Sequence, residues 1–332
     1  MRSGIQVAPD TLLGVPVPPP KLMAALDDLA AGVSAQRLAA EVDRWQARYH
    51  DPAADLSHAA QLRPEQAIAY AVYRMPATYA ATATALSALA AAIPNLAPAT
   101  LLDLGSGAGA ATWAAAETFA SLQESIALER DPEMTAVARR LPPALDRVSG
   151  QLADLSAIKE FPTIDLAIAG YSLNELSPST VDTVLSRLAL SANTVLIVEP
   201  GTPRGFAVVR QARERLVSLG MSVAAPCPHD DTCPIVDPDW CHFSVRLPRS
   251  ALHRRVKKAD LGYEDEKFSY VAATRLPVHP ANARVLRHPQ VRSGHILLRL
   301  CTDSDGLTDV TVSKRQGDTY KRARRISWGE PW

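Results

Sequence analysis

A glycine-rich loop is the part of this sequence with the clearest chemical purpose. Asp103, Gly105, Gly107 and Gly109 lie in the run Asp-Leu-Gly-Ser-Gly-Ala-Gly, directly after an apolar stretch. Glycines let the backbone turn sharply and approach a ligand closely, because no Cβ blocks the way. Dinucleotide-binding domains use a related loop spaced G-x-G-x-x-G, whereas the spacing here is G-x-G-x-G. The run therefore predicts a cofactor-binding turn between a strand and a helix.

The spacing of this loop, together with the acid before its first glycine, resembles motif I of class I S-adenosylmethionine-dependent methyltransferases. The resemblance implies that Glu129, which ends the next strand, accepts hydrogen bonds from the ribose hydroxyls of the cofactor. It also implies that Asp154 receives the adenine amino group, whereas Asp154 considered alone could instead be a helix cap. Tyr171 follows the fourth strand, where a substrate would meet the methyl group. The predicted cofactor-binding residues are Asp103, Gly105, Gly107, Gly109, Glu129, Asp154 and Tyr171.

Catalytic side chains are harder to identify. Methyl transfer to a base nitrogen or oxygen usually needs a polar clamp or a base beside the methyl group. The Asn/Asp-Pro-Pro-Tyr motif of amino-group methylation is missing from the sequence. Asn174 and Glu175 are the nearby polar candidates, and either could instead hold its own loop together. The fold alone does not decide whether transfer occurs.

Four cysteines in the second half of the chain could hold a metal group. They are Cys227, Cys233, Cys241 and Cys301, spaced C-x5-C-x7-C with 59 residues before the last. Structural zinc sites usually contain two cysteines separated by only two to four residues, and no such pair exists here. Open spacing suits a four-iron cluster better, because each iron takes one thiolate at a separate corner. Spacing leaves four alternatives: unrelated buried thiols, such a cluster, a zinc site completed by His229 or His242, or a redox dithiol.

Positive charge is concentrated near the end of the chain. The formal net charge is zero, yet residues 246–325 contain 18 Lys or Arg against 8 Asp or Glu. A basic segment on a neutral protein is typical of a surface that binds a polyanion, although a solvated face of mixed charge is equally compatible. Hydrophobic residues make up 47% and charged residues 21%, as in an ordinary globular protein.

The elements that must position these residues alternate between strands and helices. Apolar runs predict strands at Thr100–Leu104, Ser125–Glu129, Asp165–Ala169 and Val195–Glu199. Helices are predicted at about 109–122, from about 132, and at about 179–190 and 204–219. Such alternation indicates an α/β fold with a mostly parallel, doubly wound sheet, the Rossmann-like core of a class I methyltransferase.

Regions of different character flank this core. Helical periodicity extends over about 21–50 and 64–93, where Pro76 should end or kink the second helix. Beyond residue 221, strand-like runs occur at Phe268–Thr274, His295–Cys301 and Val310–Ser313. We therefore expect an N-terminal helical region at 1–95, the methyltransferase core at 96–221, and a basic extension at 222–332 that contains the cysteines and strands.

The order of several segments resembles the methyltransferase-like family whose mitochondrial members act on the small ribosomal subunit, with this chain as a bacterial member. The matching segments are Asp103–Gly109, Tyr171–Leu176, Glu199–Pro203, Cys227–Asp230, Trp240–Phe243, Tyr263–Tyr270 and Ser313–Gly329. The resemblance implies binding to small-subunit ribosomal RNA during assembly or translation, and a [4Fe-4S] cluster on the four cysteines. It also implies that RNA phosphates contact Lys314, Arg315, Lys321, Arg322, Arg324 and Arg325.

Two hypotheses of different class follow. In the first, the chain is an assembly factor that binds S-adenosylmethionine and ribosomal RNA and carries the cluster. In the second, it is an active ribosomal-RNA base methyltransferase with a structural zinc site. No apolar run reaches the roughly 20 residues of a membrane span, and no signal peptide is visible. We therefore predict a cytoplasmic protein with the small ribosomal subunit as its partner, and neither membrane nor DNA binding.

Overall fold

The centre of the protein is a mixed sheet of eight strands. A computed structural model describes residues 16–50, 61–257 and 260–332. The strands are β1 (Thr100–Leu104), β2 (Glu124–Glu129), β3 (Arg147–Leu152), β4 (Ile164–Gly170), β5 (Ala192–Pro200), β6 (Ser222–Ala225), β7 (Phe243–Pro248) and β8 (Tyr263–Thr274). Their order is β3-β2-β1-β4-β5-β8-β6, and β7 also pairs with β8.

Strand direction identifies the fold class. Strands β1 to β5 pair in parallel, whereas β8 is antiparallel to β5, β6 and β7. The order 3-2-1-4-5 is that of a doubly wound nucleotide-binding sheet. The antiparallel strand β8 lies between β5 and β6. The predicted fold class is therefore confirmed, and the sheet includes strands that come after residue 221.

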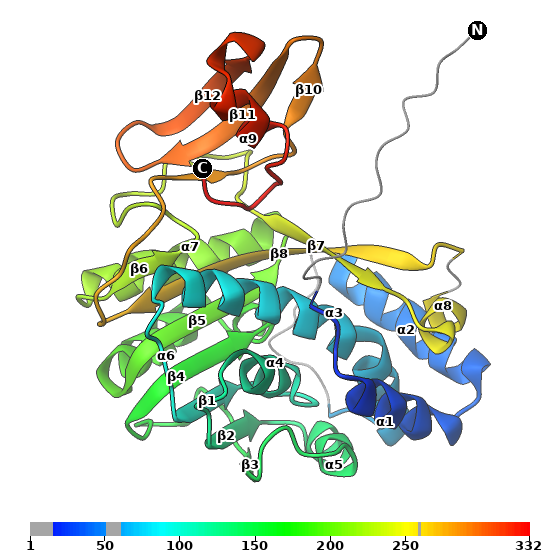
Figure 1. The fold of residues 1–332 in the computed structure, drawn as a ribbon. Helices are drawn as coiled ribbons and strands as arrows, with labels where there is room; N and C mark the ends of the chain where they lie inside the picture. Colours follow the sequence, from blue (N-terminus) through cyan, green and yellow to red (C-terminus); the bar gives the residue numbers. More distant parts are fainter. Residues whose placement is uncertain (1–15, 51–60, 258–259) are drawn as a thin grey trace, which may run out of the picture.

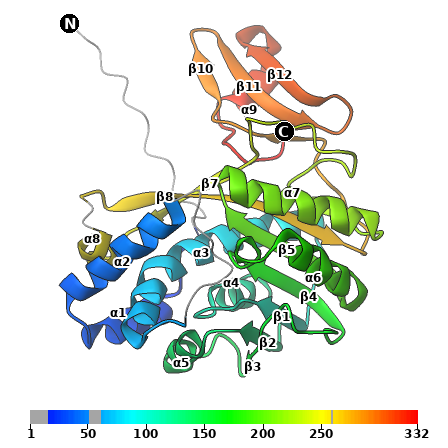
Figure 2. The ribbon, with the colours of Figure 1, turned by 180° about the vertical axis from the view of Figure 1, so that it is seen from behind.

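Helices cover both faces of the sheet, as Figures 1 and 2 show from opposite sides. One face carries α3 (Pro64–Ala92), α4 (Ala110–Thr118) and α5 (Pro132–Arg140), and the other carries α6 (Pro178–Ser191) and α7 (Pro203–Ser218). Successive residues of each strand pack against the helices on opposite faces of the sheet. In β4, Leu166 and Ile168 pack with α3 and α4, and Ala167 and Ala169 pack with α6.

The N-terminal region consists of α1 (Pro20–Ala31), α2 (Ala35–His50) and α3. Of the two predicted effects of Pro76, ending the helix or kinking it, the first does not occur, because α3 continues through this residue. Proline costs a helix one backbone hydrogen bond. Residues on both sides of Pro76 are buried, and their packing against the sheet and α4 offsets that loss. None of the helices in the described ranges is both long enough and apolar enough to cross a bilayer.

A smaller sheet lies beyond the edge of the central one, at the top of Figure 1. Its strands are β9 (Ala283–Val285), β10 (Gln290–Arg292), β11 (His295–Thr302) and β12 (Gly306–Ser313). The 3-10 turn η2 (Lys314–Gln316) and the short helix α9 (Asp318–Ala323) follow, and α8 (Ala251–Lys257) connects β7 to β8. The strand-like runs predicted after residue 221 therefore correspond to β8, β11 and β12.

Candidate cofactor pocket and cysteine cavity

The glycine loop has the backbone shape that its sequence predicts. Gly105, Gly107 and Gly109 have φ values of 64°, 55° and 90°, in the left-handed region that side chains disfavour. A Cβ on Gly105 would lie only 2.4 Å from the Cβ of Ser172. The loop can therefore pass close to the turn after β4 only if this residue has no side chain.

Asp103 connects the strand before the loop to the helix after it. Its buried carboxylate accepts hydrogen bonds from the backbone N–H and the hydroxyl of Thr112, at 3.1 and 2.7 Å. Burial raises the pKa of Asp103 to about 6, although the bonds from Thr112 oppose that shift. Asp103 is not among the residues that line the pocket. The structure thus gives this residue a role in fixing α4 against β1.

Glu129 ends β2 and lines the pocket. Its Oε2 accepts the N–H of Gly107 at 2.8 Å, and its Oε1 accepts the N–H of Asp131 at 2.8 Å. Burial raises the pKa of Glu129, against these backbone hydrogen bonds. Asp154 also lines the pocket, and its carboxylate accepts bonds from Ser156, which lower its pKa. Both predicted acids therefore border the same cleft.

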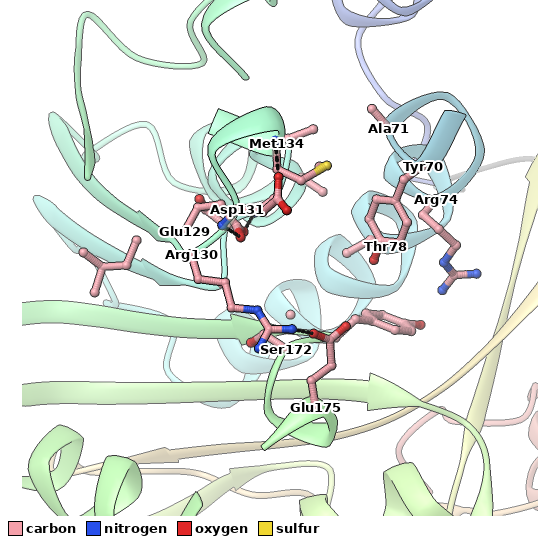
Figure 3. Close-up of a pocket in the computed structure, with 18 of the residues that line it drawn as sticks. Tyr70, Ala71, Arg74, Thr78, Glu129, Arg130, Asp131, Met134, Ser172 and Glu175 are labelled. Carbon is pink, nitrogen blue, oxygen red and sulfur yellow. Dashed lines mark hydrogen bonds and ion pairs between the residues drawn. The ribbon is translucent and has the colours of Figure 1, made fainter. Parts of the chain in front are cut away.

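The cleft lies at the carboxyl ends of β1, β2 and β4, where open α/β sheets bind ligands. Figure 3 shows Tyr70 and Thr78 of α3 facing Glu129, Asp131 and Met134 across it. The N-terminal helices thus form one wall of the pocket, a contribution that the motif itself does not reveal. The remaining lining residues are Trp45, Leu62, Ala71, Arg74, Met75, Gly105–Ala108, Ala110, Leu128, Arg130, Ala153–Leu155, Gly170–Ser172, Glu175 and Leu176.

The two predicted catalytic residues have different positions. Asn174 is buried, and its side-chain amide donates to the carboxylate of Glu199, which also accepts the N–H of Leu173 at 2.9 Å. Glu175 does line the pocket, where its Oε2 accepts a hydrogen bond of 3.1 Å from Arg130. Figure 3 shows this ion pair below the centre of the cleft. Only Glu175 of the two therefore reaches the pocket.

Glu199 is a buried acid that motif reasoning did not select. It is the penultimate residue of β5, and it is fully shielded from solvent. Burial raises its pKa to about 8, although hydrogen bonds from Asn174 and Leu173 oppose the shift. The sequence feature that could have identified Glu199 is an acid near the carboxyl end of a predicted central strand. Its position holds the turn after β4 against β5.

Tyr171 is the non-glycine residue with a positive φ in the described chain, at 61°. Its backbone N–H donates to the carbonyl of Val198 at 2.7 Å, and its hydroxyl donates to Oε1 of Glu266 at 2.8 Å. Burial and then the charge of Glu266 raise the pKa of Tyr171. Arg74 of α3 forms an ion pair of 2.9 Å with the same carboxylate. Neither Arg74 nor Glu266 was predicted from the sequence.

The four predicted cysteines line a second cavity, bordered by α7, β8 and β11. Cys301 is buried and the other three are half-buried. Burial raises the pKa of Cys241 well above its usual value, and the charges of Cys227, Cys233 and Cys301 raise it further. Burial, and then the charges of Cys227 and Cys233, raise the pKa of Cys301 to about 12. Sequence segments far apart thus bring four thiols around one space.

Cationic and imidazole groups join the thiols. Arg213 and Arg284 line the cavity, and His229 approaches the Sγ of Cys301 to 3.6 Å through Nε2. The Nε of Arg213 and the Nδ1 of His229 are buried without a hydrogen-bond partner. Within the described ranges, no three His, Cys, Asp or Glu side chains converge on a point suitable for one metal ion.

The predicted RNA-binding residues lie on η2, α9 and the turn after it. All six are exposed: Lys314, Arg315, Lys321, Arg322, Arg324 and Arg325. Lys321 pairs with Asp318 at 2.8 Å, and the Arg322 guanidinium lies 4.7 Å from the centre of the Trp332 ring. Trp328 is half-buried against His242 and His288. The segment therefore presents several cations on one short stretch of chain.

Comparison with known proteins relates this architecture to a family. Residues 64–332 match the family described as mitochondrial small ribosomal subunit Rsm22. The human ribosome assembly protein METTL17, mitochondrial, is 29% identical over 290 residues, which cover 79% of this chain and 61% of the human protein. The Rsm22-cox11 tandem protein 2, mitochondrial, of Schizosaccharomyces pombe is 26% identical over 187 residues, covering 41% of this chain and 24% of the yeast protein. This chain thus spans less than two thirds of either relative.

Among solved structures, the magnesium protoporphyrin IX methyltransferase of Synechocystis, with bound S-adenosylmethionine, has a TM-score of 0.40 to this chain. It is 15% identical, and the match covers 77% of this chain and 97% of the enzyme.

Proposed function

This chain belongs to the Rsm22 family of the mitochondrial small ribosomal subunit, and we propose that it is an S-adenosylmethionine-binding factor for assembly of small ribosomal subunits. The observation that carries the proposal is the pairing of the left-handed glycine loop with Glu129 at the edge of a large cleft. The names of the relatives support the ribosomal role, since one is a ribosome assembly protein.

The pocket residues suit this cofactor. Backbone groups of the loop can approach the ligand because Gly105 and Gly107 have no side chains. The Glu129 carboxylate can accept hydrogen bonds from two ribose hydroxyls, and Asp154 can accept one from an adenine amino group. Bound S-adenosylmethionine would supply a methyl group on a positively charged sulfur. Glu175 and Arg130 would border the ligand as an ion pair.

The cysteine cavity suits a [4Fe-4S] cluster, with zinc as the alternative metal. Four thiols surround one space instead of meeting at one point, as a cluster with a ligand at each corner requires. Arg213 and Arg284 would offset the negative charge of the thiolates, and a metal would favour ionised thiols that burial otherwise keeps neutral. A zinc site would use His229 beside Cys301.

The basic C-terminal segment suits contact with ribosomal RNA. Exposed Lys and Arg side chains of η2 and α9 can neutralise phosphates, which gives affinity without sequence selectivity. Phosphate contacts orient a protein on its RNA, and they would thereby position the chain on the small subunit.

We favour an assembly role over methyl transfer, because both predicted catalytic side chains already have partners. Asn174 donates to Glu199, and Glu175 accepts from Arg130. The test is to incubate the protein with precursors of small subunits and methyl-labelled S-adenosylmethionine. Co-sedimentation with precursors and no label in RNA supports the factor. Label in RNA that disappears in Gly107→Arg supports an enzyme, and the absence of both co-sedimentation and label contradicts both roles.

A further inference from the structure

Three residues from distant segments meet at one wall of the cofactor pocket. Arg74 lies on α3, Tyr171 follows β4, and Glu266 lies on β8. The guanidinium of Arg74 donates to both oxygens of Glu266, at 2.9 and 3.4 Å, and the Tyr171 hydroxyl donates to Oε1 at 2.8 Å. The two charged side chains are only 16% and 14% exposed. Their interaction is therefore weakly screened by solvent.

Tyr171 depends on this cluster for its position. Its φ of 61° is unfavourable for a residue with a bulky side chain, so neighbouring contacts must hold it there. One contact is the backbone hydrogen bond to Val198, and another is the hydroxyl bond to Glu266. The Arg74 guanidinium also lies 5.1 Å from the centre of the tyrosine ring. Tyr171 and Arg74 both line the pocket.

We propose that Arg74 and Glu266 are positioning residues, which hold Tyr171 against the ligand and balance the charge of this pocket wall. The inference rests on the proposed binding of S-adenosylmethionine. In this proposal α3 and β8 complete the cofactor site. Both elements lie outside residues 96–221, the segment that carries the cofactor motifs.

The negative charge of Glu266 balances the positive charge of Arg74 beside the pocket, and this balance should affect charged and neutral ligands differently. If Glu129 and Asp154 bind the nucleoside end of the ligand, as proposed above, the lining residues Gly170, Tyr171 and Ser172 would lie toward its sulfur end. The sulfur of S-adenosylmethionine is positively charged, whereas that of S-adenosylhomocysteine is neutral. An uncompensated Arg74 would repel the first ligand and not the second. Glu266 therefore allows a cation-bearing ligand to bind beside a guanidinium.

The experiment is calorimetric titration of the full chain with each ligand. Glu266→Gln keeps an acceptor for the Tyr171 hydroxyl but removes the charge that balances Arg74. We expect about tenfold weaker binding of S-adenosylmethionine and much less change for S-adenosylhomocysteine. Asp265→Asn is the matched control, because Asp265 directly precedes Glu266 in β8 and pairs with Arg246 at a more exposed position. It should leave both affinities unchanged.

Two further variants separate positioning from charge. Arg74→Met with Glu266→Met removes both charges without leaving one buried alone, so the fold should survive. This double variant, and Tyr171→Phe, should weaken both ligands by a similar factor and restore the wild-type ratio of the two affinities. Thermal unfolding of each variant identifies the folded ones.

The outcomes are distinct. Equal weakening of both ligands by Glu266→Gln, or no difference from Asp265→Asn, would overturn the role of the pair while leaving cofactor binding intact. If Glu266→Gln does not fold, an unchanged affinity in the folded double variant would overturn it as well. Failure of the wild-type chain to bind either ligand would instead remove the proposed function and the inference with it.

Discussion

The backbone N–H of Gly107 donates a hydrogen bond of 2.8 Å to Oε2 of Glu129, which joins the glycine loop to the end of the neighbouring strand. The other carboxylate oxygen accepts the N–H of Asp131 at the start of α5. Two backbone donors thus fix the orientation of the side chain that we assign to the ribose. A ligand meets a carboxylate that is already oriented, which lowers the entropy lost on binding.

Replacing Glu129 with Gln should weaken S-adenosylmethionine binding by about tenfold to a hundredfold. A neutral amide accepts weaker hydrogen bonds from hydroxyls than a carboxylate does. Equilibrium titration measures the change. Glu124→Gln is the control, because Glu124 begins the same strand at the end remote from the pocket. Equal affinities for Glu129→Gln and the wild type would exclude the ribose role.

Replacing Gly105 with Ala should abolish cofactor binding and lower the free energy of unfolding by about 2 kcal/mol or more. The added Cβ would overlap Ser172, at 2.4 Å, and the residue would retain an unfavourable φ. Gly150→Ala in β3 is the control, since its Cβ would have no neighbour within 4 Å. Chemical denaturation and titration measure the two effects. A stable Gly105→Ala protein that binds normally would show that the loop approaches nothing closely.

Iron and acid-labile sulfide should each be present at about four per chain after purification without oxygen. Cys233→Ser should lose most of both, because each iron needs its own thiolate. The same variant should expose residues 222–301 to limited proteolysis, since the cluster would connect the segment between β6 and β7, which carries three of the cysteines, to β11. Stoichiometric zinc would favour the alternative site. No metal, with unchanged proteolysis of Cys233→Ser, would leave four buried thiols.

Changing Lys321, Arg322, Arg324 and Arg325 together to Gln should weaken binding to ribosomal RNA and flatten its dependence on salt. Each cation that no longer neutralises a phosphate should reduce the slope of log K against log salt by roughly one. A charge-matched control changes Arg37, Arg139, Arg140 and Arg147, which lie on other elements. If both variants show the same slope as the wild type, the α9 segment makes no phosphate contacts.

The pH dependence of stability should reveal the buried carboxyl of Glu199. Its pKa is raised from 4.5 to about 8 in the folded state, so between these values the folded protein holds a proton that the unfolded chain releases. The free energy of unfolding should therefore fall as pH rises through this window. His253, whose pKa is lowered to about 4, has the opposite effect up to about pH 6.5.

Glu199→Gln isolates this contribution, because it removes the titrating group and keeps a hydrogen-bond acceptor. Relative to the wild type, the variant should gain stability steadily from pH 5 to pH 8 in urea titrations. The clearest part of the effect should lie between pH 6.5 and 8, where the protonation of His253 no longer changes. A difference between the two proteins that is constant with pH would contradict a protonated Glu199.

The local parts of the pocket could be predicted from the sequence. The glycine loop connects β1 to α4 within a few residues, and its left-handed conformation follows from residue type alone. Glu129 was identifiable because an acid ends a strand beside the loop, and parallel strands bring their carboxyl ends to one edge. The alternation of strands and helices was sufficient for the fold class. Pro76 was predicted to end or kink its helix, and the sequence did not show that buried packing on both sides would let the helix continue through it.

Contacts between distant segments were decided by the tertiary structure. Arg74 and Glu266 are 192 residues apart, and Glu266 is 95 residues from Tyr171. Their meeting requires β8 to enter the sheet beside β5 and α3 to cover its face. Asn174 illustrates the same limit, because its partner Glu199 comes from the next strand. Four cysteines likewise share a cavity only once β11 lies near the segment between β6 and β7.

The physical reason is that residue type and spacing determine backbone conformation and the acids at strand ends, which depend on a few neighbouring residues. Strand register, side-chain burial and the pairing of charges depend on how whole elements pack. The sequence by itself therefore determined the loop, the acid at the end of the neighbouring strand and the fold class of this protein. Only the packed structure decided which wall completes the pocket, which polar side chains already have partners, and that the four thiols surround one space.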